Sequence, residues 1–276
     1  MIEGTIEVTV LVEDSARERG LCGEHGLSFL IQLPRHTILF DLGQTDLFIK
    51  NSRVLGLPLR KTNHIVISHG HYDHGEGLPY LKNILQDFIL YLHPNSLERK
   101  YVERGVDKKD IGLTWTEKTV KEMGGAIEFV TEAQKLPFGG YLTGEITRDI
   151  PDDEQLVGAT ASGPDKLCDD QALVLPTPQG LIIVVGCSHA GILNTLEQAK
   201  RIANDERIRA VIGGFHLLHA SDQQIASTLE RLRELDVGLW GPCHCTGIRA
   251  QVSLLQAFPQ RVRCLTTGSR LMFEGR

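Results

Sequence analysis

The sequence predicts an α/β fold in which two similar halves, each with strands followed by helices, pack sheet to sheet. Two observations carry this prediction. Short apolar runs between turn residues indicate strands, and they are followed by segments whose apolar residues recur at helical spacing. The 276 residues are 41% hydrophobic, which is enough for one large core or two modest ones. We therefore expect a single domain over residues 1–276.

The first half begins with strand-like runs, and Pro34 to His36 form the turn between the second and the third. Leucine and isoleucine residues then recur at helical spacing after a short apolar strand. The expected elements are strands over 5–12, 27–33, 37–40 and 63–67, and a helix over 75–86.

Residues 93–165 give mixed signals, because short patterns of both kinds are separated by glycines. We interpret this span as an inserted segment that could cover an active site. It is expected to contain helices over 95–104 and 116–123, strands over 126–130 and 141–147, and a loop over 150–168.

The second half has a clearer pattern, in which strand-length apolar runs alternate with helical ones. Ser221 and Gln224 form a capping-box pair at the start of one helix. The expected strands are 172–175, 181–185, 210–213, 237–240, 262–265 and 271–274, with helices containing Ile192, Leu196 and Ala199, then Ile225, Leu229 and Leu232, then Ile248, Val252 and Leu255.

Composition excludes several functional classes. The net charge is −6 and no basic stripe is present, so neither nucleic acid nor an acidic membrane is an expected partner. The longest apolar runs have the length of strands, and the chain begins with a strand pattern rather than a signal peptide. Cytoplasm is the expected location. The six cysteines are expected to be reduced thiols, since a core of this size needs no disulfides.

The most informative motif is His69-Gly-His71-Tyr-Asp73-His74, which places four metal-ligand side chains within six residues. A strand is expected before it and a helix after it. On such a turn alternate residues can converge, so that His69 and His71 face one ion while Asp73 and His74 face a second. Two ions roughly 3.5–4 Å apart can share a hydroxide and clamp an oxyanion.

Further ligands are expected where other strands end and helices begin. His189 in Gly-Cys-Ser-His-Ala-Gly and His244 in Pro-Cys-His-Cys-Thr both occupy such positions. A histidine there can instead bond to backbone, but the first cluster favours ligand roles for both.

Four more residues have weaker cases for a role in the site. Asp170, before an apolar strand, is predicted to complete a metal shell or bridge two ions. Cys187 could ligate or be a small buried hydrophobe. His216, at a strand end, is a candidate ligand, general acid or substrate contact. Asp41 is a candidate for the carboxylate that orients a metal-binding histidine. Elsewhere, His25 could line the pocket but is more simply a loop residue.

These motifs resemble those of the metallo-β-lactamase superfamily. The histidine cluster looks like that superfamily's signature, and Phe40-Asp41-Leu42-Gly43 is similar to its first motif. Other motifs narrow the resemblance to a branch known as dihydropterin-(ribofuranosyl)aminobenzene phosphate synthase-related proteins. They are Glu24-His25-Gly26, Asp169-Asp170-Gln171, Gly186 to Gly191, Gly213 to Leu217 and Cys243 to Gly247.

The resemblance implies a four-layer αββα sandwich with a dinuclear site, most often zinc, at one edge of the sheets. It implies ligand roles for His69, His71, Asp73 and His74, and His244 resembles the histidine of the last motif. The chain departs from the common pattern by having Asp169-Asp170 where many members have a histidine, and Cys187 where many have a bridging aspartate.

The sequence as a whole predicts a metal-dependent hydrolase that uses a metal-activated water on a phosphoester, lactone or other small ester. Asp73 is expected to ligate and to orient the nucleophile, and His216 to stabilise the developing oxyanion. Two zinc ions are expected, with manganese or iron as alternatives, and the substrate is expected to be small, phosphorylated or heteroaromatic. A pterin-pathway transferase, an iron-based redox protein and a non-catalytic metal-bound sensor remain alternatives.

Overall fold

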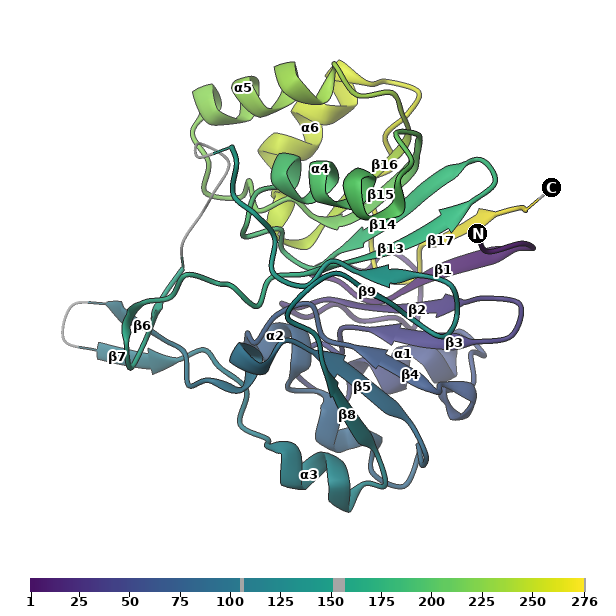
Figure 1. The fold of residues 1–276 in the computed structure, drawn as a ribbon, viewed down its shortest axis with the longest axis vertical. Coiled ribbons are helices and arrows are strands. Elements are labelled where there is room, and N and C mark those ends of the chain that lie inside the picture. Colours follow the sequence, from purple (N-terminus) through teal and green to yellow (C-terminus); the bar gives the residue numbers. More distant parts are fainter. Residues whose placement is uncertain (105–106, 151–156, 276) are drawn as a thin grey trace.

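Two β-sheets lie face to face between outer layers of helices in the computed structural model, which describes residues 1–104, 107–150 and 157–275 (Figure 1). Helices α4 (Ile192–Ala203), α5 (Asp222–Leu232) and α6 (Ile248–Ala257) cover one sheet. Helices α1 (Leu47–Val54) and α3 (Glu117–Glu122) cover the other. This is the four-layer αββα sandwich predicted from the sequence.

The first sheet has seven strands in the order β17-β1-β2-β3-β4-β5-β8. Its first four strands pair antiparallel and its last four pair parallel, so that β3 takes part in both arrangements. The strands are β1 (Ile6–Val12), β2 (Ser28–Gln32), β3 (Thr37–Phe40), β4 (His64–Val66), β5 (Ile89–Leu92), β8 (Ala126–Phe129) and β17 (Arg270–Phe273).

The second sheet has six strands in the order β16-β15-β14-β13-β10-β9. β14, β15 and β16 run parallel, so their carboxyl ends meet at one edge of the sheet. The strands are β9 (Gln134–Lys135), β10 (Tyr141–Leu142), β13 (Ala172–Thr177), β14 (Gly180–Val185), β15 (Ile208–Gly214) and β16 (Val237–Cys243).

A small third sheet projects from the sandwich and is visible at the left of Figure 1. Its order is β12-β11-β6-β7. The strands are β6 (Tyr101–Arg104), β7 (Asp107–Asp110), β11 (Ala159–Thr160) and β12 (Gly163–Pro164). Within the span 93–165, β8 extends the first main sheet and β9 and β10 extend the second.

Short helical turns complete the described chain. They are α2 (Tyr72–Gly75), η1 (Leu59–Lys61), η2 (Leu78–Leu81), η3 (Pro94–Leu97) and η5 (His244–Thr246). No helix among the described residues is both long and apolar enough to cross a bilayer. All six cysteines are free thiols, as predicted.

Most predicted elements are confirmed, but the expected helix over 75–86 is wrong. The chain instead forms two short turns, α2 and η2. Gly77 approaches the main chain of Leu42 so closely that a Cβ there would lie 2.1 Å from the Leu42 carbonyl oxygen. Pro79 at the start of η2 also lacks the N–H that a continuing helix needs.

Three other predictions fail in part. Residues 95–104 form η3 and strand β6 rather than a helix, because the backbone N–H of Ile111 donates to the carbonyl of Lys100 and joins the segment to β7. The strand predicted over 141–147 is limited to β10. The last one, over 262–265, is a single bridge between Val262 and Trp240. The loop predicted over 150–168 contains the short strands β11 and β12, and its residues 151–156 lie outside the described residues.

His64, at the start of β4, gives a testable pH dependence. Its ring packs against Phe138 and Tyr91. Burial, and then the neighbouring His36, lowers the pKa of His64 to about 4 from 6.5. As the pH falls, His64 gains a proton in the unfolded chain at a higher pH than in the folded protein. Protonation therefore favours the unfolded chain, and the free energy of unfolding falls as the pH drops from 6.5 toward 4.

We expect the thermal midpoint of metal-free protein to fall over that pH range, and to fall less in a His64→Gln variant. Differential scanning fluorimetry with a chelator present measures both. Identical pH profiles for the two proteins would show that His64 does not contribute.

Candidate active site

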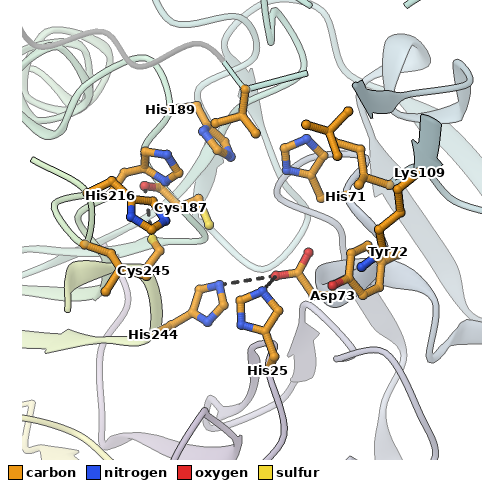
Figure 2. Close-up of a pocket in the computed structure, with 15 residues that line it drawn as sticks. His25, His71, Tyr72, Asp73, Lys109, Cys187, His189, His216, His244 and Cys245 are labelled. Atoms are coloured by element: carbon orange, nitrogen blue, oxygen red, sulfur yellow. Dashed lines mark hydrogen bonds and ion pairs between the residues drawn. The ribbon is translucent and has the colours of Figure 1, made fainter. Parts of the chain in front are cut away.

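The carboxyl ends of four strands deliver the predicted site residues to one cavity. The loop after β4 carries His69, His71, Asp73 and His74, and the loop after β14 carries Cys187 and His189. His216 follows β15, and His244 follows β16. Figure 2 shows the side chains of His71, Asp73, Cys187, His189, His216 and His244 around a shared pocket, and His69 and His74 contact this group from beneath it. Parallel strands explain this convergence, because their ends share one edge of a sheet.

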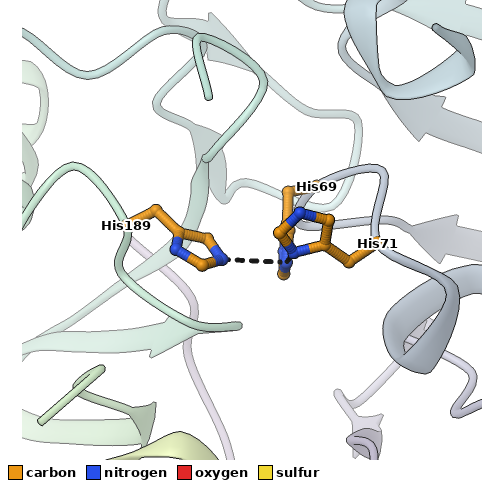
Figure 3. Close-up of side chains that lie close together, drawn as sticks. All are labelled: His69, His71 and His189. Atoms are coloured by element: carbon orange, nitrogen blue, oxygen red, sulfur yellow. Dashed lines mark hydrogen bonds between the residues drawn. The ribbon is translucent and has the colours of Figure 1, made fainter. Parts of the chain in front are cut away.

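The first donor set consists of His69, His71 and His189 (Figure 3). His69 Nε2 lies 3.0 Å from His71 Nδ1 and 3.3 Å from His189 Nε2. Ser68 Oγ donates its proton to Asp41 Oδ2, so it must accept from His69 Nδ1 at 2.9 Å. His69 Nε2 therefore carries no proton, and its lone pair points at the other two nitrogens.

The second donor set consists of Asp73, His74 and His244. His74 Nε2 and His244 Nε2 are 3.2 Å apart, and Asp73 Oδ2 lies 3.6 Å from the first and 3.4 Å from the second. His74 Nδ1 donates to Asp41 Oδ2 at 2.7 Å. In the neutral ring, His74 Nε2 then carries no proton and has a free lone pair. Asp41 thus orients a histidine, as predicted, and it is fully buried.

Both sets have the spacing of a tetrahedral metal site. Zinc–nitrogen bonds of about 2.0–2.1 Å place neighbouring nitrogens about 3.3 Å apart at the tetrahedral angle. The nitrogen separations of 3.0 and 3.3 Å in the first set and 3.2 Å in the second are close to that value. His69 Nε2 and His74 Nε2 each present a lone pair to a neighbouring ring nitrogen at this distance, an arrangement that suits a shared cation, so the residues fit two metal ions.

The charge state of the donors also suits a cation. Burial lowers the pKa of His71 to about 4, and burial with the neighbouring His74 and His71 lowers that of His69 further. Burial acts to raise the pKa of the Asp73 carboxyl, but His74 and His244 outweigh it and hold that pKa well below its usual range. His69 and His71 are therefore neutral imidazoles and Asp73 is an ionised carboxylate at neutral pH. At His244, burial acts to lower the pKa, but hydrogen bonds to Asp14 and Asp73 outweigh it and raise that pKa.

Two further residues lie beside the second set: Asp14, which was not predicted, and His25, which was offered only as a possible pocket residue. Asp14 Oδ1 accepts from His244 Nδ1 at 2.8 Å, which turns His244 Nε2 toward Asp73. His25 Nε2 lies 3.3 Å from Asp73 Oδ2 and lines the pocket, although the sequence favoured a simple loop role (Figure 2). The position of Asp14 just past the end of β1 was the available signal, because the other site residues also follow strands.

Asp170, predicted as a ligand, belongs to neither donor set. Its Oδ2 accepts a hydrogen bond from the backbone N–H of Ala190 at 2.8 Å, and burial raises its pKa to about 7. Through this hydrogen bond the Asp170 carboxylate holds the loop that carries His189. We therefore expect Asp170 to affect metal binding by positioning His189, and the geometry does not support Asp170 as a metal ligand.

The adjacent Asp169 faces a different partner and joins the first donor set to the third sheet. Its Oδ2 accepts from the N–H of Gly70, between His69 and His71, at 2.7 Å. Its Oδ1 accepts from Lys100 Nζ at 3.1 Å, and Lys100 also donates to Asp165 at 2.7 Å. Lys100 is only 1% exposed. This buried ion network, which the sequence did not indicate, fixes the histidine loop.

The cavity above the donor sets has a volume of about 240 Å³. His216 lies on one wall with its ring 4.2 Å from that of His189, so its predicted place in the site is supported, while its role stays a prediction. Residues from and beside the third sheet form another wall, and the cover expected from residues 93–165 stays a prediction. The pocket is also lined by Tyr72, Val102, Lys109, Ile111, Val157, Leu218 and His219.

The family follows from comparison with known proteins. A family model described as the metallo-beta-lactamase superfamily matches residues 23–244, which contain both donor sets. The chain belongs to the metallo-beta-lactamase superfamily. Within it, the chain resembles the crystal structure of Tm1679, a metal-dependent hydrolase of the beta-lactamase superfamily, with 32% identity and a TM-score of 0.83. The match covers 98% of this chain and 99% of that one.

A curated superfamily relative supports the predicted branch. The 7,8-dihydropterin-6-methyl-4-(beta-D-ribofuranosyl)-aminobenzene-5'-phosphate synthase of Methanocaldococcus jannaschii is 28% identical over 97% of each chain. A diphosphatase of the PhnP family has the same fold, with a TM-score of 0.58, 15% identity and 98% coverage of both chains.

Proposed function

We propose that this protein is a dinuclear zinc hydrolase that acts on phosphate esters of a small aromatic or heteroaromatic compound. The convergence of two complete donor sets at the floor of one cavity supports this proposal. When bound there, two zinc ions would supply Lewis acidity and a water of lowered pKa. His69, His71 and His189 would hold one ion, and Asp73, His74 and His244 the other.

The chain's own residues orient the reacting groups. Asp73 is held by His25 and His244, so its carboxylate is fixed at the cavity floor, where it can align a nucleophile. His216 lies on the opposite wall, beside His189. An imidazole there can donate a hydrogen bond to an oxygen that gains charge as the ester breaks.

The walls favour an anionic substrate with an apolar part. Lys109 lines the mouth from β7, where its ammonium group lies 5.4 Å from the centre of the Tyr72 ring. A cation at this position can pair with a phosphate oxygen. Val102 and Ile111 supply apolar surface beside it, which suits an aromatic ring. The chemistry therefore matches an aryl or heteroaryl phosphate better than a lactone.

A panel of phosphomonoesters, phosphodiesters, carboxylic esters and lactones tests this proposal with zinc-loaded protein. We expect turnover of aryl phosphate esters and little turnover of neutral esters. If a neutral lactone were hydrolysed far faster than every phosphate ester, the proposed substrate class would be wrong.

Lys109→Ala is expected to raise KM for an aryl phosphate by about tenfold, because the variant lacks one charge-assisted hydrogen bond to the phosphate. We expect KM for a neutral ester of similar size to be unchanged. Lys108→Ala is the matched control, because Lys108 stacks over Tyr101 at 3.1 Å and does not line the cavity. Steady-state kinetics on both substrates check the result, and equal effects of the two variants would exclude a phosphate contact by Lys109.

A second candidate is a transferase of the pterin pathway, and the curated relative of that name favours it. The same cavity would then bind an amine and a phosphorylated sugar donor. Incubating the protein with phosphoribosyl donors and aromatic amines separates the two candidates, since coupling would yield a new C–N or C–C bonded product rather than free phosphate.

A further inference from the structure

Cys187 and Cys245 lie side by side in the cavity wall, although the strands before them are not neighbours. Cys187 follows β14 and Cys245 follows β16, and β15 lies between these two strands. The two sulfur atoms are nevertheless within 4.8 Å of each other. The Cys245 thiol also donates to the carbonyl oxygen of Cys187 at 3.6 Å. The two side chains are therefore close enough to react with each other.

Gly214, the last residue of β15, makes this approach possible. Neighbouring strands are about 4.8 Å apart, so the ends of β14 and β16 are expected to be roughly 10 Å apart. A Cβ at Gly214 would lie 2.4 Å from Cys245 Sγ and 3.5 Å from Cys187 Cα. The Cys245 sulfur thus occupies the space that any other residue at position 214 would fill with its own side chain.

Both thiols can be reached from the cavity. Cys187 is 4% exposed and Cys245 is 7% exposed, and both line the pocket above the donor sets. Figure 2 shows them on the same side of the pocket, beside His216. Because the cavity has a volume of about 240 Å³, it admits a molecule as small as hydrogen peroxide. Cys243, in contrast, is buried in the core between the two main sheets.

We propose that Cys187 and Cys245 are a site of reversible disulfide formation by small peroxides. One sulfur attacks an oxygen of hydrogen peroxide, the O–O bond breaks, and a sulfenic acid and water form. The second sulfur then attacks the sulfenic sulfur, so that the S–S bond forms and the S–O bond breaks to release another water. Each peroxide molecule takes two electrons and two protons from the pair and leaves as two waters. A dithiol reductant reverses the reaction.

The disulfide would tie together two loops that carry donor residues. Cys187 lies two residues before His189, and Cys245 directly follows His244. The sulfurs have to move from their present separation to a bond length of about 2.05 Å, which draws the two loops toward each other. This inference is independent of the proposed function, because the disulfide forms whether or not the protein hydrolyses a phosphate ester.

Peptide mapping of the full-length protein after treatment with hydrogen peroxide tests the proposal. Zinc-loaded and chelated samples are both treated, alkylated and digested without reductant. We expect a pair of peptides joined through Cys187 and Cys245, and a decrease of about 2 Da in the mass of the chain, both reversed by dithiothreitol.

Three variants sharpen the result. Cys187→Ser and Cys245→Ser should each lack the joined peptides, whereas Cys243→Ser should form them as the wild type does. Cys243→Ser is the matched control, because that buried thiol does not line the cavity. The wild-type map decides without any variant, so a folding defect in a variant cannot hide the answer. If the two cysteines stay unjoined in both samples, or if either is joined to a different cysteine instead, the proposal is overturned.

Discussion

The His71→Ala variant is expected to lose one metal ion and more than about 100-fold in turnover. Removing a group that merely orients a ligand costs about 10–100-fold, and a ligand itself should cost more. His71 Nδ1 faces His69 Nε2 at 3.0 Å in the first donor set. Metal analysis of the purified variant and kinetics on an aryl phosphate measure both losses.

His36→Ala is the control for that substitution. His36 also contacts another histidine, with its Nδ1 3.2 Å from His64 Nε2, but it lies outside the cavity. Circular dichroism should show both variants folded, and His36→Ala should keep its metals and its turnover. A His71→Ala protein with normal metal content and normal turnover would remove His71 from the site.

The second large effect is expected from Lys100→Met, which should lower the free energy of unfolding by about 3–5 kcal/mol. Burial acts to lower the pKa of Lys100, but Asp169 and Asp165 outweigh it and raise that pKa, so the lysine is charged. Removing this charge leaves two carboxylates buried without their counter-ion. Urea unfolding of the metal-free protein gives the value.

Lys50→Met is the surface counterpart, because the ion pair of Lys50 on α1 with Asp46, the N-cap of that helix, is exposed and should contribute little to stability. Lys100→Met should also reduce turnover, since Asp169 then loses the cation that holds it against Gly70. The opposite ranking of the two variants in stability would show that the buried network does not stabilise the fold.

The sequence predicted the main layers and most of the site because the relevant signals are local. His69, His71, Asp73 and His74 follow one strand, and His189 and His244 follow two others. Parallel strand ends must meet at a sheet edge, so convergence could be expected without coordinates.

The failures come from contacts that are distant in the sequence. The partner of Asp170 is the N–H of Ala190, and two adjacent acidic residues do not reveal which of them faces a metal. In the sequence, Lys100 cannot be told from a surface lysine, because its partners Asp165 and Asp169 come close to it only in the folded protein. The helix expected over 75–86 has the right apolar spacing, but Gly77 is held by the backbone of the neighbouring loop, with its N–H donating to the carbonyl of Gly43.

The central claim is that the two donor sets hold metals on which hydrolysis depends. The most direct measurement is a zinc titration of chelated, metal-free protein, with turnover of an aryl phosphate ester recorded against bound zinc per chain. The account predicts no turnover in the metal-free protein and a rise that levels off at about two ions per chain. Full turnover in a sample shown to contain no metal would contradict it.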